Sequence, residues 1–264
     1  MTEQITFTEL LTSARKSDKG AAWSIPDHWM QGRTTYGGLS AALCYAAVEN
    51  EITDLPPLRS AMVTFVGPAA GEVQSDVKVL RRGKSALFVE ADLHSEKGLA
   101  TRAQFVFGAA RKSDFDFMEC AAPDVPGPDA SEDCFKGGRG PAFTANFDLR
   151  LAKGAMPMAG SEISEHYFWA RHRDSEADGI AAILAAADMP PPAVMPMFKT
   201  FGPISSITWQ LNFLTSTPVT RADWWLLQSK AENAVEGYSS QDMTIWNLDR
   251  TPIATCRQCV AIFV

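Results

Sequence analysis

Two Ala-rich stretches in the chain are apolar on nearly every side, and each is followed by four runs in which apolar and polar residues alternate. The first stretch spans 36–53 and the second spans 178–188. A helix that is apolar on most faces is a buried helix, whereas strict alternation is typical of a strand with one buried face. The pattern therefore predicts two buried helices, each followed by four strands with short turns, as in an antiparallel sheet.

This order of one helix and four strands occurs twice, which indicates an internal duplication. Residues 111–140 separate the two copies and are rich in proline, glycine and acidic residues. We therefore expect an N-terminal unit over 1–110, a linker or surface loop over 111–140, and a C-terminal unit over 141–264. One unit alone would expose a sheet face, so the two units are expected to pair their sheets edge to edge in an α+β fold.

The last strand of each copy carries Ala-Thr followed by a glutamine. The glutamines are Gln104 in LATRAQFVFG and Gln258 in IATCRQCVAIFV. Gln258 is the one strongly polar residue on an apolar strand face, whereas Gln104 shares its face with Arg102. A buried amide is costly unless it is hydrogen-bonded. Gln258 is therefore either a structural tie between strands or an amide that orients a water molecule or a substrate carbonyl.

Two further polar residues follow the second helix. Asp188 ends this helix, where the helix dipole opposes a carboxylate. It is either a solvated helix-end residue or a general base whose pKa is raised by the dipole and by partial burial. Ser206 begins the next strand, and its face continues through Thr208. Gln210 and Asn212 follow on the same face, which suits either a solvent-facing strand or the wall of a polar cleft.

Composition and charge exclude several other classes of protein. The net charge of −7 gives the surface no general attraction for nucleic acid or anionic membranes. No apolar run approaches the ~18 residues of a membrane span, and the first residues lack a signal-like apolar core, so we expect a cytoplasmic protein. The fingerprints of phosphate loops, dinucleotide-binding turns and nucleophile elbows are absent, and no cofactor is expected.

The cysteines and histidines give no sign of a metal site. The five cysteines are odd in number and scattered, which is typical of reduced thiols in the cytosol. Cys256 and Cys259 have the spacing of half a metal site, but no second pair accompanies them, and residues three apart on a strand face opposite ways. The four histidines also lack metal-ligand spacing. We therefore expect no bound metal.

The order and spacing of four segments make the chain resemble the double-hotdog acyl-CoA thioesterases, the type II acyl-CoA thioesterase-like family. The segments are TTYGGLSAAL, LRSAMVTFVGPA, AAADMP and IATCRQCVAIF. The resemblance covers nearly the whole chain and implies a tandem hotdog fold, in which two antiparallel sheets, each wrapped around a central helix, join into one extended sheet. It also implies an acyl-CoA substrate and a homodimer of double hotdogs.

The resemblance also implies a set of catalytic residues. An Asp, a Ser or Thr, and a Gln hold and activate water in this family, and they fall on Asp188, Ser206 and Gln258. Family members commonly continue the Ser/Thr strand with Asp-His-Ser, whereas this chain reads Thr-Trp-Gln from Thr208. Thr208 is therefore a rival to Ser206 for the hydroxyl group of the site and is counted among the substrate-binding candidates.

The implied reaction is hydrolysis of a thioester without a covalent intermediate. Asp188 would take a proton from water, and backbone N–H groups around Gly37 and Gly38 would stabilise the oxyanion. The same glycine pair also fits close packing of the helix start. Two alternative functions stay open, namely a hotdog hydratase or dehydratase that acts on acyl thioesters, and a non-catalytic acyl-CoA-binding protein.

Overall fold

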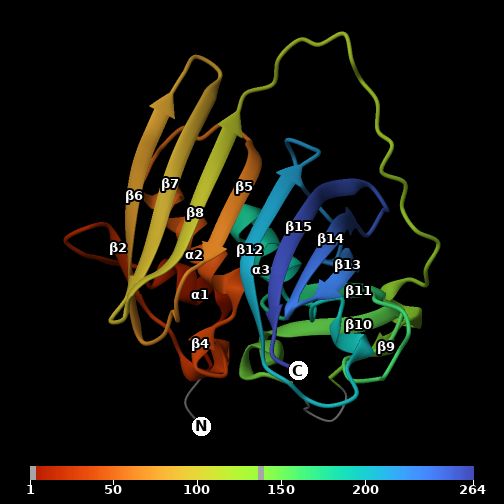
Figure 1. Cartoon of the computed structure of the whole chain (residues 1–264). Helices are drawn as coiled ribbons and strands as arrows, with labels where there is room; N and C mark the ends of the chain where they lie inside the picture. The colour runs from red at the N-terminus through yellow and green to blue at the C-terminus, as the bar shows by residue number, and fades with distance from the viewer. Residues whose placement is uncertain (1–3, 136–139) are drawn as a thin grey trace.

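A 13-stranded antiparallel sheet curls around two buried helices in the computed structural model, which describes residues 4–135 and 140–264 (Figure 1). The alternating runs of the sequence form its long strands, as predicted. The elements of the first half are α1 (Phe7–Thr12), β1 (Arg15–Lys16), β2 (Ala21–Ser24), η1 (Asp27–Trp29), β3 (Met30–Gln31), β4 (Thr34–Thr35), α2 (Gly37–Glu51), β5 (Leu58–Phe65), β6 (Glu72–Arg82), β7 (Ala86–Ser95) and β8 (Gly98–Gly108).

The second half repeats the order of a central helix followed by four long strands. Its helix begins after Asp178, whose side chain accepts the backbone N–H of Gly179, and it ends three residues before Pro190. The elements are η2 (Pro128–Ala130), β9 (Glu132–Asp133), η3 (Ala142–Asn146), β10 (Phe147–Lys153), β11 (Glu165–His172), α3 (Gly179–Ala187), η4 (Met195–Met197), β12 (Ile204–Phe213), β13 (Trp225–Val235), β14 (Tyr238–Asn247) and β15 (Pro252–Ile262).

The two halves join through one pair of strands. The order across the 13-stranded sheet is β1-β2-β6-β7-β8-β5-β12-β15-β14-β13-β11-β10-β9, and β3 and β4 form a separate small sheet. β5 and β12, the first strands after the two helices, pair antiparallel, with Val63 opposite Trp209. The edge-to-edge union predicted from the sequence is therefore confirmed, and Figure 1 shows the two curled halves meeting at this pair.

The two central helices pack against each other inside the curled sheet. Gly38 to Val48 of α2 and Ala181 to Ala187 of α3 are all buried, which is the reason why both stretches are apolar on nearly every side. One hydrophobic cluster contains side chains from both helices and from the strands of both halves. No helix in the described part of the chain is long and apolar enough to cross a membrane.

The segment between the halves is only partly a loop. Residues 109–127 contain no helix or strand and arch around the outside of the molecule (Figure 1). Beyond them β9 pairs with β10, so this part of the segment predicted as a linker belongs to the sheet of the second half. Residues 136–139 lie outside the described residues. The domain boundaries themselves stay a prediction.

Candidate active site

The candidate residues meet where the end of α3 lies against the start of α2. Asp188 is the C-cap of α3, and Gly37 and Gly38 are the first two residues of α2. A Cβ atom on Gly37 would lie 2.5 Å from Oδ2 of Asp188. A Cβ atom on Gly38 would lie 2.7 Å from the backbone oxygen of Ala185. The two helices thus approach too closely for a side chain at either glycine, which fits the close-packing interpretation of the pair.

Gln258 connects Asp188 to Ser206. Its side chain is 3% exposed and lies on the inner face of β15. Its Nε2 atom donates to Oδ1 of Asp188 at 2.8 Å and to Oγ of Ser206 at 3.0 Å. The structure therefore brings together the three residues that the resemblance singled out, although 70 positions separate the aspartate from the glutamine.

A β-bulge decides which hydroxyl group belongs to this cluster. In the pairing of β12 with β15, Ser206 lies opposite Val260 but Thr208 lies opposite Cys259, so Ile207 is an extra residue. The bulge turns Ser206 to the inner face, whereas Thr208 is exposed on the outer face. The expectation that Ser206 shares one face with Thr208, Gln210 and Asn212 is therefore wrong, because simple alternation does not hold across a bulge.

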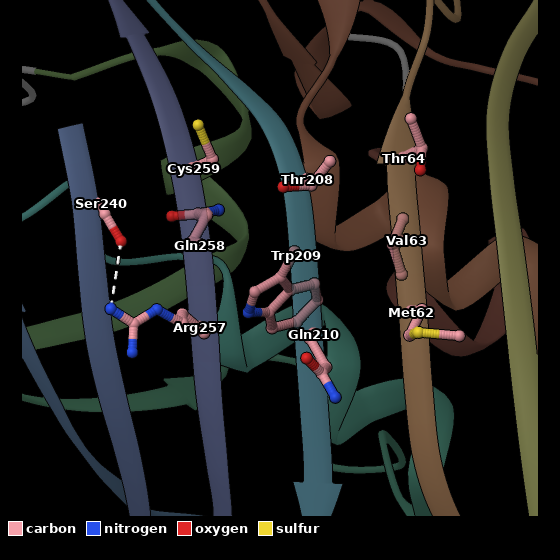
Figure 2. Close-up of a pocket in the computed structure, with 10 residues that line it drawn as sticks. All are labelled: Met62, Val63, Thr64, Thr208, Trp209, Gln210, Ser240, Arg257, Gln258 and Cys259. Atoms are coloured by element: carbon pink, nitrogen blue, oxygen red, sulfur yellow. Dashed lines mark hydrogen bonds between the residues drawn. The ribbon is translucent and has the colours of Figure 1, made fainter. Parts of the chain in front are cut away.

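Thr208 lines a hollow on the other surface of the sheet, at the junction of the two halves. The hollow has a volume of about 420 Å³ and is also lined by Met62, Thr64 and Arg257 (Figure 2). Met62, Thr64 and Thr208 belong to the exposed positions of β5 and β12, and Gln258 borders the hollow as well. The structure thus separates Thr208 from Asp188, so Thr208 is not the hydroxyl group beside the carboxyl group, and its part in substrate binding stays a prediction.

The carboxyl group of Asp188 has an altered affinity for protons. Burial raises its pKa to about 7, and hydrogen bonds from the Gln258 side chain and the Gly38 backbone oppose that rise by stabilising the charged form. Burial is therefore the cause of the raised pKa that the sequence suggested. The end of α3 disfavours a carboxylate, whereas the start of α2 favours one.

The hydrogen bond from Gly38 changes the expectation for the glycine pair. The backbone N–H of Gly38 is directed to the Asp188 carboxylate, so it holds the candidate base. Gly37 precedes it in the first turn of α2, where backbone N–H groups have no partner within the helix. Of the two predicted donors for an oxyanion, Gly37 is the one left for that role.

Sequence reasoning missed Gln241, which also contacts the cluster. Gln241 is 1% exposed on β14, lies opposite Gln258 in the strand register, and donates to Oε1 of Gln258 at 2.8 Å. Gln241 alternates with Ser239, Met243 and Ile245 along its strand. A strongly polar residue on a mostly apolar strand face is the signal that identified Gln258, and Gln241 has the same signal.

Counted from the helix start and from the arginine of the last strand, the first copy has alanines where the second copy has Asp188 and Gln258. Asp188 comes nine residues after the first residue of α3, and Ala46 comes nine residues after the first residue of α2. On the last strand, Gln258 follows the exposed Arg257, whereas the buried Ala103 follows the exposed Arg102. Gln104 points outward and donates to Glu90 at 3.2 Å, so the two glutamines do serve different purposes.

The arrangement provides a base, a hydroxyl group and an amide donor at one point. A carboxylate with a pKa of about 7 is half ionised at neutral pH, so it is suited to accept and return a proton. Among the described residues, no group of three His, Cys, Asp or Glu side chains could hold a metal ion. The geometry therefore suits proton transfer to and from a water molecule or a bound substrate.

Two family models match the chain. The model described as acyl-CoA thioesterase N-terminal domain matches residues 25–108, and the model described as acyl-CoA thioesterase C-terminal domain matches residues 119–262. No curated protein matches the chain by sequence.

Solved structures of similar shape cover nearly the whole chain. A hot dog fold protein of unknown function from Alicyclobacillus acidocaldarius is 23% identical, with a TM-score of 0.87 and 97% of each chain covered. A putative thioesterase II from Thermobifida fusca is 14% identical, with a TM-score of 0.81 and 99% of each chain covered. An acyl-CoA thioesterase II, TesB2, from Mycobacterium marinum is 16% identical, with a TM-score of 0.75 and coverage of 96% and 97%. These likenesses show a tandem hotdog fold.

Proposed function

Because this chain belongs to the acyl-CoA thioesterase family, we propose that it hydrolyses acyl-CoA thioesters to a free acid and CoA. The observation that supports this proposal most directly is the contact of Asp188 with Gln258, together with the raised pKa of the carboxyl group. A base with a pKa near the working pH transfers protons most efficiently in general acid–base catalysis.

In the proposed reaction, Asp188 activates water directly. The carboxylate removes a proton from a water molecule while the water oxygen forms a bond to the thioester carbon, and the carbonyl oxygen becomes an oxyanion. The oxyanion then collapses, the carbon–sulfur bond breaks, and the CoA thiolate takes the proton back from Asp188. The acid and CoA leave, and Asp188 is again ionised.

In this scheme Ser206 holds the water molecule or the carbonyl group, and Gln258 holds Ser206 and Asp188 in place. Gln258 donates to the oxygen of Ser206, so the hydroxyl hydrogen of Ser206 is directed elsewhere and is available to a substrate atom. The backbone N–H of Gly37 is the proposed donor to the oxyanion, at a helix start that favours negative charge.

The proposal is tested with purified protein, a panel of acyl-CoAs of different chain length and a thiol reagent. Wild-type protein is expected to release free CoA, and Asp188→Asn is expected to lower kcat by about 10²–10⁴-fold, since it removes the general base. Wild-type protein that releases no CoA from any member of the panel would overturn the proposal. Hydration of an enoyl-CoA without thiol release would favour a hydratase, and tight binding without reaction would favour a binding protein.

Three finer predictions concern the preferred acyl chain length, the oligomeric state and the cellular location. The acyl-CoA panel reports the preferred chain length. The homodimer of double hotdogs and the cytoplasmic location stay predictions, and sedimentation of the purified protein tests the first of them.

A further inference from the structure

The side-chain amides of Gln241 and Gln258 form a chain of hydrogen bonds in which each group donates to the next one toward Asp188. The backbone N–H of Ala193 donates to Oε1 of Gln241 at 2.8 Å. Nε2 of Gln241 donates to Oε1 of Gln258 at 2.8 Å, and Nε2 of Gln258 donates to Asp188 at 2.8 Å. Ala193, Gln241 and Gln258 are all buried, so water does not compete for the two bonds that Gln241 makes with Ala193 and Gln258.

The direction of this chain is fixed at its far end. A backbone N–H can only donate, so the side chain of Gln241 must turn its oxygen toward Ala193 and its NH2 group toward Gln258. Gln258 must then turn its own oxygen toward Gln241, which leaves its NH2 group facing Asp188 and Ser206. The orientation of Gln258 is therefore set by Gln241, independently of whether Asp188 carries a proton.

We propose that Gln241 is a positioning residue that keeps Gln258 a hydrogen-bond donor to Asp188 throughout the reaction. This inference rests on the proposed function for its catalytic meaning. Once Asp188 holds the proton taken from water, a free glutamine would rotate and offer its carbonyl oxygen to the new carboxylic acid hydrogen. Gln241 occupies that oxygen and prevents the rotation, so the proton stays available for the leaving thiolate.

Two other ionisable groups interact with the charge of Asp188 in the described part of the chain. They are the hydroxyl group of Tyr36, just before α2, and the thiol group of Cys256, on β15. Burial raises the pKa of both groups well above neutral, so both are uncharged where the enzyme would work. The effect of a substitution at Gln241 on the pKa of Asp188 can therefore be measured near neutral pH, because neither of these two groups gains or loses a proton there.

The test uses Gln241→Met, which keeps the length of the side chain and removes its hydrogen bonds to Ala193 and Gln258. The pKa of Asp188 is measured by carboxyl carbon NMR, which needs no substrate, and kcat and KM are measured with an acyl-CoA that the wild type hydrolyses. Since the protonated acid gains the carbonyl of Gln258 as an acceptor, we expect the pKa of Asp188 to rise by about one unit. We expect kcat to fall about tenfold or more with KM nearly unchanged.

Two further variants make the outcome decisive. Gln241→Leu removes the same two hydrogen bonds and adds no charge, so it should raise the same pKa if the methionine variant does not fold. Gln104→Met removes the outward amide of the first copy and should change neither the pKa of Asp188 nor kcat. An unchanged Asp188 pKa in the folded Gln241 variants overturns this inference, whereas absence of CoA release by wild type overturns only the proposed function.

Discussion

At the scale of single residues, Asp188 combines an advantage for catalysis with a cost for folding. Burial raises its pKa to about 7, which suits a group that must accept a proton and give it back at neutral pH. The same burial makes the charged carboxylate less stable in the folded protein than in water. Hydrogen bonds from Gln258 and Gly38 recover part of that loss.

This cost makes the stability of the protein depend on pH in a defined direction. The folded-state pKa of Asp188 lies above its ordinary value of 3.8, so its contribution to stability is full below pH ~4 and is lost as the pH rises through ~7. Asp188→Asn should therefore raise the free energy of unfolding at pH 8 by on the order of 1–3 kcal/mol relative to wild type. Urea titrations at pH 8 and pH 4 measure this, and an equal difference at both values would contradict it.

The two hydroxyl residues around the bulge should differ sharply in their effect on activity. Ser206 accepts a hydrogen bond from Gln258, whereas Thr208 is on the other face of the sheet. We expect Ser206→Ala to lower kcat about tenfold or more and Thr208→Ala to leave it near the wild-type value. Steady-state kinetics with one acyl-CoA compares them, and the opposite ranking would place the substrate in the outer hollow.

At the scale of elements, the sequence predicted most of the fold because its patterns are regular. Both buried helices and the four strands after each of them follow from alanine-rich and alternating stretches. Asp188 and Gln258 stand out because each breaks such a pattern. The bulge at Ile207 could not be predicted in this way, since one extra residue in a strand leaves no mark in the composition. Gln241 carried the same signal as Gln258 and was predictable.

The contact between the start of α2 and the end of α3 is the element-scale feature that builds the site. Gly38 faces the Ala185 backbone oxygen and the Tyr36 ring, each 2.7 Å from where a Cβ atom would stand. The hydroxyl group of Tyr36 also donates to that backbone oxygen, at 3.3 Å. A backbone atom cannot rotate away as a side chain does, so the contact leaves little freedom to adjust.

Gly38→Ala should therefore push the two helices apart. We expect it to lower the free energy of unfolding by about 1–3 kcal/mol, the usual cost of overpacking, and to lower kcat because Asp188 moves. Gly127→Ala is the matched control, because no atom lies within 4 Å of its Cβ position. Urea unfolding and kinetics of both variants test this, and similar stability of the two variants would rule out a tight helix contact.

At the scale of the whole molecule, the two copies are not independent units. One hydrophobic cluster runs through both halves, and the candidate site takes Gly38 from the first copy and Asp188 from the second. Sequence patterning identified the two copies but could not show that they share a core, because patterns along a strand do not specify which distant face it contacts. We infer that neither half would assemble the site by itself.

The alanines at positions 46 and 103 lead to a prediction about the stoichiometry of ligand binding to one polypeptide. At these two positions the first copy has neither a carboxylate nor an amide group, so we expect one reactive site in each polypeptide. Isothermal titration with a non-hydrolysable thioether analogue of acyl-CoA should therefore reach saturation at one equivalent per polypeptide. Two equivalents would show that the first copy also binds ligand although it lacks these groups.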